Sequence, residues 1–167
     1  MKIRGVVFLS SPRPVWLNPD VKLKIAWIGK SKEPAIQSLT DEYLKRLSRY
    51  ADVQGTALKD ESALLKLCGR DARSAKNTLV LLDSRGKQLS SEEFAEFLGN
   101  HQDRNPLPLL FAVGPANGFT PEIRREANLL LSLGKMTVAH ELARVVLLEQ
   151  LYRAFTILKG HPYHLGH

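Results

Sequence analysis

The residue types best suited to proton chemistry gather near the end of the chain. Three histidines, His161, His164 and His167, recur at three-residue spacing around Tyr163. Because histidine titrates near neutral pH, its ring can accept a proton from a substrate. A metal site is the weaker interpretation, since no cysteine or carboxylate joins the histidines and Pro162 interrupts a regular helix. A flexible tail is the interpretation that needs no chemistry.

The segment before this tail combines charged side chains with an apolar helical pattern. Apolar residues repeat at helical spacing over residues 140–158, and Arg144, Glu149 and Arg153 lie between them. Glu149 and Arg153 are one turn apart, so an ion pair between them needs no catalytic role. His140 opens the segment and could bind a substrate or only the nearby backbone. Because the pattern is apolar on two sides, we expect the helix to lie between a sheet and a second subunit.

A glycine-rich turn at residues 114–118 (Gly-Pro-Ala-Asn-Gly) follows a continuous apolar run at residues 107–114. Ligands of α/β sheets bind beyond the carboxyl ends of the strands, so we expect residues 83–86, 114–118 and 134–140 to form a site. Turn geometry alone also explains the Asn-Gly pair. The sequence has no dinucleotide fingerprint, Walker A sequence, GxSxG elbow or HExxH pair. Hydrolase and metal-enzyme interpretations therefore have little support.

Strands alternate with helices along the chain, which indicates an α/β class with a largely parallel sheet. Ser90 and Glu93 form a capping box, and Thr120 with Pro121 is typical of a helix start. The predicted strands cover residues 21–28, 53–58, 77–83, 107–114 and 129–133, and the predicted helices cover residues 33–50, 61–68, 91–98, 121–128 and 140–158.

The size and charge of the chain favour one basic domain. The chain has 167 residues and a net charge of +7, with the basic excess in its first 50 residues. Residues 1–20 are rich in proline and are expected to form an N-terminal extension to a domain at 21–167. The single cysteine, Cys68, cannot form an intrachain disulfide, which favours a cytoplasmic location. No apolar run is long enough to cross a membrane.

Several blocks of residues, taken in order, resemble one family. The blocks are residues 81–87, 111–118, 131–140 and 144–155, followed by Tyr163-His164. Over residues 22–164 the chain is similar to the SPOUT-class methyltransferases that modify N3 of a pseudouridine in helix 69 of 23S ribosomal RNA. The order and spacing of the blocks carry this resemblance.

The resemblance implies a fold, a cofactor and a set of partners. It implies one SPOUT domain with a C-terminal trefoil knot, and a homodimer that acts on 23S rRNA within the ribosome or its large subunit. S-adenosyl-L-methionine would bind in the knot, and no metal would be needed. The implied cofactor-binding residues are Leu82, Gly114, Leu133, Gly134, Lys135, Met136, Thr137 and Val138.

The resemblance also implies roles for four side chains. His164 and Tyr163 would act at the target base, Arg144 would position it, and His140 is a further candidate. A basic surface would hold the RNA backbone, and its candidate members are Lys24, Lys30, Lys32, Lys45, Arg46 and Arg49.

The chain departs from the family pattern at three positions. Pro115 stands where a second glycine is common and removes a backbone N–H donor. Ala139 stands where a proline is usual, and Leu165 where a basic residue is usual. Two alternatives therefore stay open: a SPOUT enzyme that modifies another RNA, and an RNA-binding dimer without catalytic activity.

Overall fold

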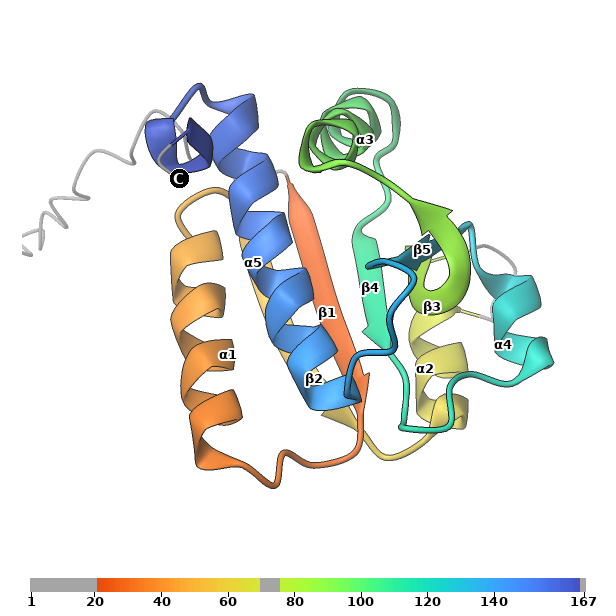
Figure 1. The fold of residues 1–167 in the computed structure, drawn as a ribbon. Coiled ribbons are helices and arrows are strands. Elements are labelled where there is room, and N and C mark those ends of the chain that lie inside the picture. The colour runs from red at the N-terminus through yellow and green to blue at the C-terminus, as the bar shows by residue number, and fades with distance from the viewer. Residues whose placement is uncertain (1–20, 70–75, 166–167) are drawn as a thin grey trace, which may run out of the picture.

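A parallel five-stranded sheet forms the centre of the computed structural model, which describes residues 21–69 and 76–165 (Figure 1). The strand order is β2-β1-β4-β3-β5, and every neighbouring pair is parallel. This arrangement confirms the predicted α/β class. The strands are β1 (Lys22–Ile28), β2 (Asp52–Leu58), β3 (Thr78–Gln88), β4 (Leu109–Val113) and β5 (Leu129–Ser132).

Helices cover both faces of the sheet, and each face has its own core. On one face α1, α3 and α5 pack over a cluster that includes Phe111 and Leu147; on the other, α2 and α4 pack over Leu81 and Ile123. The central strand β4 is buried along its whole length, which explains its continuous apolar sequence. The helices are α1 (Pro34–Leu47), α2 (Glu61–Cys68), α3 (Ser91–Arg104), α4 (Pro121–Glu126) and α5 (His140–Leu158).

The predicted helix starts are confirmed, but one cap works differently from its sequence pattern. At the start of α3, the Glu93 N–H donates to Ser90 Oγ at 3.1 Å and the Ser90 N–H donates to the Glu93 carboxylate at 2.7 Å. Thr120 occupies the N-cap position of α4, yet its hydroxyl makes no cap bond. It donates instead to Glu61 Oε2 at 2.6 Å, because Glu61 at the start of α2 lies beside it.

The strand β3 continues to Gln88, past the predicted end at residue 83. Leu131 of β5 pairs with Leu82 and again with Lys87, so β3 curls around β5 (Figure 1). A Cβ on Gly86 would lie 2.6 Å from the backbone of Leu131, so this close passage requires glycine. Residues 80–82 and residues 87–88 of β3 therefore lie on either side of β5. The trefoil knot that the resemblance implies stays a prediction.

Three helices differ in length from their predictions, since α4 also ends early, at Glu126, and the tail is not the free segment that was expected. The helix α1 ends at Leu47, and α3 continues to Arg104. The tail forms a short 3-10 helix, η1 (Pro162–Leu165), which packs against α5, so the prediction of a flexible tail is wrong for these residues. Aromatic packing of Tyr163 on α5 is the physical reason. The predicted extension at residues 1–20 lies outside the described residues.

Candidate functional site

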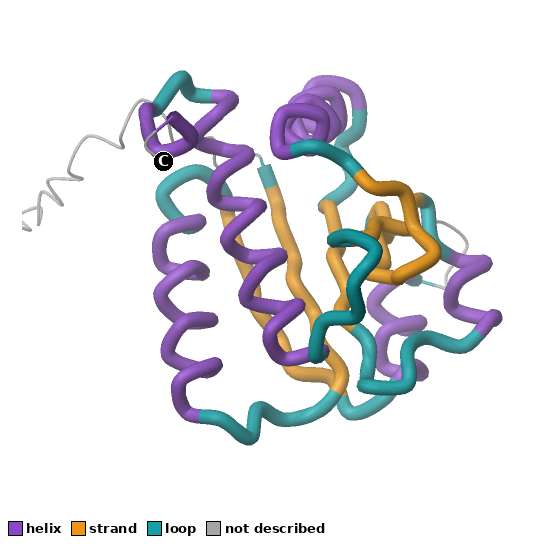
Figure 2. Tube along the Cα trace, in the orientation of Figure 1, coloured by secondary structure: helices purple, strands orange, loops and turns teal. Residues whose placement is uncertain are grey.

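A cavity of about 510 Å³ opens at the carboxyl ends of β4 and β5, beside the middle of β3. The sequence placed these three segments together, but residues 83–86 lie within β3 and do not form a loop. The loops after β4 and β5 lie close to each other in the trace (Figure 2). A cavity of this volume is in the range of small-molecule sites. Of the residues expected to hold the cofactor, Lys135 alone is absent from the lining; the others are Leu82, Gly114, Leu133, Gly134, Met136, Thr137 and Val138.

Three glycines, Gly114, Gly118 and Gly134, lie in the cavity wall. Gly134 has a φ of +148°, and no atom lies within 4 Å of the position where its Cβ would stand. The Ser132 hydroxyl donates to the Gly134 carbonyl at 2.9 Å and fixes this turn. A Cβ on Gly114 would lie 3.1 Å from the Phe119 ring, which is a tight contact, so glycine at this position suits the packing of Phe119. At Gly134, where no side chain intervenes, the backbone can approach a ligand closely.

Glu61 joins the loop after β4 to the start of α2. Its two carboxylate oxygens accept hydrogen bonds from the Thr120 N–H at 2.8 Å and from the Thr120 hydroxyl at 2.6 Å. The Pro115 carbonyl accepts a bond from the Gly118 N–H at 2.9 Å within the same loop. The bonds to Glu61 thus hold the Thr120 end of the loop, and the Pro115–Gly118 bond closes a turn within it, although Pro115 itself offers no N–H to a ligand.

Asp83 and Arg124 form a partly buried ion pair in the cavity wall. Arg124 Nε donates to Asp83 Oδ2 at 2.6 Å, and the Arg85 N–H donates to Asp83 Oδ1 at 2.9 Å. Burial alone would raise the pKa of Asp83, but the bonds from Arg85 and Arg124 outweigh it and lower the pKa below its ordinary value. Asp83 therefore stays ionised in the folded protein at neutral pH.

Two of the predicted catalytic residues lie near the start of α5, and their environments differ. His140 lines the cavity and is exposed. Arg144 is buried, with 2% of its surface exposed. Its Cζ lies 4.4 Å from the centre of the Trp27 ring, and its Nη2 donates to the Ser31 hydroxyl at 2.5 Å. Burial lowers the pKa of Arg144. In this chain Arg144 holds the loop after β1, and its role at a target base stays a prediction.

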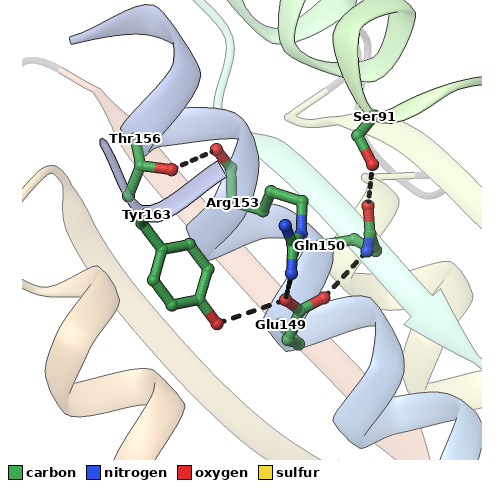
Figure 3. Close-up of polar contacts among 6 residues, drawn as sticks. All are labelled: Ser91, Glu149, Gln150, Arg153, Thr156 and Tyr163. Carbon is green, nitrogen blue, oxygen red and sulfur yellow. Dashed lines mark hydrogen bonds and ion pairs between the residues drawn. The ribbon is translucent and has the colours of Figure 1, made fainter. Parts of the chain in front are cut away.

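Tyr163 lies at the other end of α5, in a network of side chains centred on Glu149 (Figure 3). The Glu149 carboxylate accepts bonds from Arg153 at 2.6 Å, from the Gln150 amide at 2.8 Å and from the Tyr163 hydroxyl at 3.3 Å. The expected ion pair of Glu149 and Arg153 is therefore confirmed. Burial, supported by Tyr43 and Glu149, raises the pKa of Tyr163 to about 12. At neutral pH this phenol is a hydrogen-bond donor.

His164 extends the same cluster toward α3. Its Nε2 lies 2.7 Å from the Glu92 carboxylate, and its Nδ1 is covered and has no partner among the described residues. Ser91, beside Glu92, donates to the Gln150 side chain at 2.7 Å. The first turn of α3 therefore contacts both η1, through Glu92, and α5, through Ser91.

The structure separates the predicted site residues into two groups within one chain. His140 and Glu149 are nine positions apart on α5, which is a rise of about 13 Å. The cavity lies at the start of this helix, and Tyr163 and His164 lie toward its end. The predicted site residues did not include Glu61, Glu92 or Arg124, because each of these side chains contacts a partner that is distant in the sequence.

Comparisons with known proteins identify the family. Residues 21–164 match the family described as predicted SPOUT methyltransferase. Ribosomal RNA large subunit methyltransferase H of Koribacter versatilis is 59% identical over 88% of this chain and 100% of its own length. The protein of the same name in Gloeobacter violaceus is 42% identical over 87% of this chain and 100% of its own length.

Solved structures share the fold at low sequence identity. A probable methyltransferase from Bordetella pertussis Tohama I has a TM-score of 0.56 and 9% identity, over 81% of this chain and 95% of that one. The SpoU methyltransferase AviRb from Streptomyces viridochromogenes, in complex with AdoMet, has a TM-score of 0.50 and 14% identity, over 84% of this chain and 59% of that one.

The chain belongs to the SPOUT methyltransferase family. It is an enzyme whose methyl donor is S-adenosylmethionine. The cavity fits such a ligand, because its volume of about 510 Å³ is in the range of small-molecule sites and its wall has open space at Gly134. Within the described ranges, no group of three histidine, cysteine or carboxylate side chains is arranged to hold a metal ion. In the same ranges no helix has the length and apolar character of a membrane span.

Proposed function

We propose that this enzyme transfers a methyl group from S-adenosylmethionine to N3 of a pseudouridine in helix 69 of 23S rRNA, in the cytoplasm. The observation that carries the proposal is the cavity, which gathers nearly all the residues that the family resemblance assigns to the cofactor. Full-length similarity to proteins named Ribosomal RNA large subunit methyltransferase H supports the choice of RNA.

The cavity loops would hold the adenosine and methionine parts of the donor, largely through backbone groups of Leu82, Gly114 and residues 133–138. When bound, S-adenosylmethionine supplies an activated methyl group on its sulfonium. The protein must then align the N3 atom with that methyl group and remove the N3 proton. The C–S bond breaks as the N3–C bond forms, and S-adenosylhomocysteine leaves with the sulfur electron pair.

Tyr163 and His164 are proposed to act at the target base. Because the pKa of Tyr163 is about 12, its hydroxyl would position the base and would not accept the proton at neutral pH. Because the Glu92 carboxylate can only accept a hydrogen bond, Nε2 of His164 carries the proton in this contact. After the RNA displaces Glu92, the tautomer with its proton on Nδ1 would accept the N3 proton through Nε2.

A second copy of the chain would bring the two groups of residues together. Apolar side chains are exposed on α1, on the loop before α5 and on the first half of α5. Burying them against a second copy would cover apolar surface next to the cavity. The tail of one subunit would then complete the cavity of its partner. These side chains are Leu39, Met136, Val138, Leu142 and Val146.

Basic residues near Tyr163 support an RNA surface at this end of the molecule. Arg46 stacks over the Tyr43 and Tyr152 rings, at 5.3 and 5.7 Å, and Tyr152 contacts Tyr163. Lys45, on the same helix as Arg46, is exposed, and so is Arg49, which follows the end of this helix. Lysine and arginine on such a surface would contact phosphates, so affinity for ribosomes should fall as salt concentration rises.

The test is a methyl-transfer assay on ribosomes that lack the modification, with mass spectrometry of the helix 69 fragment. We expect one added methyl group on the pseudouridine base. A methyl group on a different nucleotide would contradict the proposed target and indicate a SPOUT enzyme for another RNA. Absence of transfer, together with absence of S-adenosylmethionine binding by calorimetry, would indicate an RNA-binding dimer without catalytic activity.

A further inference from the structure

Charged side chains are few among the residues that line the cavity. Asp83, Arg85, Arg124 and His140 are the titratable members of the lining. Asp83 is committed to its two partners, Arg85 N–H and Arg124 Nε. Either arginine side chain could therefore meet a negatively charged part of a ligand.

Arg124 is held in place, whereas the Arg85 side chain is exposed. The bond to Asp83 uses only Nε of Arg124, and the side chain keeps 19% of its surface accessible. Its Nη2 lies beside the loop after β4, 3.7 Å from the position that a Cβ on Gly118 would occupy. No hydrogen-bond acceptor for its two terminal nitrogens is found among residues 21–69 and 76–165.

This geometry suits recognition of a carboxylate. A guanidinium offers donors in a fixed plane, and fixing Nε on Asp83 sets the direction of the remaining N–H groups before a ligand arrives. Ordering the side chain in advance reduces the entropy lost on binding. The adenosine part of the methyl donor has no negative charge, and its methionine part carries one carboxylate.

We propose that Arg124 binds the methionine carboxylate of S-adenosylmethionine and of the product S-adenosylhomocysteine, with Asp83 as its positioning residue. This inference rests on the proposed use of the cavity as the cofactor site. It assigns the methionine end of the ligand to the wall formed by α4 and the middle of β3, which leaves the adenosine for the loops after β4 and β5.

The test compares two ligands by calorimetry with the full chain. S-adenosylhomocysteine carries the carboxylate, and 5′-methylthioadenosine lacks the whole amino-acid part. We expect Arg124→Met to weaken S-adenosylhomocysteine binding about tenfold to a hundredfold, as for a hydrogen bond to a charged group, and to change 5′-methylthioadenosine binding less than about twofold. Arg124→Lys should give an intermediate loss for S-adenosylhomocysteine alone, since it keeps the charge and loses the planar donors.

Arg125→Met is the matched control, because Arg125 is the next residue on the same helix, is exposed and is absent from the cavity lining. It should bind both ligands as the wild type does. Equal losses for both ligands in Arg124→Met and Arg124→Lys, or no loss in either variant, would overturn the inference. Failure of the wild type to bind either ligand would instead overturn the proposed cofactor site, so the two failures are distinguishable.

Discussion

At the start of α5 the cavity is walled in part by loops that carry glycines, whereas toward the other end of this helix Tyr163 and His164 are fixed by side chains. Glycines at positions 114 and 134 shape the cavity wall, and the two hydrogen bonds from Thr120 to Glu61 hold the loop after β4. The tail depends on the carboxylates of Glu149 and Glu92. This difference supports the proposed function, in which the cavity at the start of α5 binds a small ligand. Tyr163 and His164, toward the other end, would contact the RNA.

The largest effect is expected at Gly86, where the chain passes around β5. Gly86→Ala would place a Cβ 2.6 Å from the Leu131 backbone, and backbone cannot move away as a side chain can. We expect a loss of about 2 kcal/mol or more in the free energy of unfolding by urea denaturation, together with loss of S-adenosylhomocysteine binding. Gly29→Ala, with open space but a φ of +97°, controls for backbone strain alone. A Gly86→Ala protein as stable as this control would contradict the close passage.

The next effect concerns the tail and leaves the cavity intact. His164→Ala should lower the rate of methyl transfer about a hundredfold, a typical loss for a general base, and leave S-adenosylhomocysteine affinity unchanged. His161→Ala is the control for disturbance of η1, since its Nδ1 accepts the Tyr163 N–H at 3.2 Å. Methyl transfer by His164→Ala at the wild-type rate would remove His164 from the proposed mechanism.

A smaller effect with a defined pH dependence is expected for the ion pair in the cavity wall. Because the pKa of Asp83 is lowered in the folded protein, its ionised form stabilises the fold above the ordinary pKa of 3.8. Asp83→Asn should cost about 1–3 kcal/mol near neutral pH. This difference from wild type should shrink as the pH falls from 3.8 through the lowered pKa of Asp83 in the folded protein, where Asp83 itself becomes protonated. A difference that grew toward acid, measured by urea denaturation, would reverse the sign and contradict the ion pair.

The smallest effect is expected for the hydroxyl of Tyr163. Tyr163→Phe keeps the ring contact with Tyr152 and removes the bond to Glu149, so it should cost about 0.5–1.5 kcal/mol in the free energy of unfolding. Tyr163→Ala also removes the ring and should cost more. Equal losses in the two variants would show that the hydroxyl, and not the ring, holds η1 in place.

The sequence predicted one end of α5 better than the other, for physical reasons. Loops after parallel strands meet at one edge of a sheet, so the pattern of strands and helices already placed residues 83–86, 114–118 and 134–140 together. The helix α5 matched its predicted bounds because its apolar repeat is long and regular. The cofactor residues themselves came from the family resemblance, since glycine-rich turns have many uses.

The features that sequence analysis missed depend on partners far apart in the chain. Arg124 pairs with Asp83 across 41 positions, and His164 contacts Glu92 across 72. No local pattern records such pairs. The continuation of β3 to Gln88 was missed for the same reason, because it depends on pairing with Leu131 and Ser132 of β5.

Complementation between two inactive variants tests the central claim most directly. Gly134→Val would fill the cavity of one chain, and His164→Ala would remove the tail imidazole of the other. If a subunit's tail completes its partner's cavity, an equal mixture of the two, unfolded and refolded together, should regain about a quarter of wild-type methyl transfer, since half the dimers are mixed and each has one intact site. Activity no greater than that of the separate variants would show that cavity and tail act within one chain, and would contradict the account.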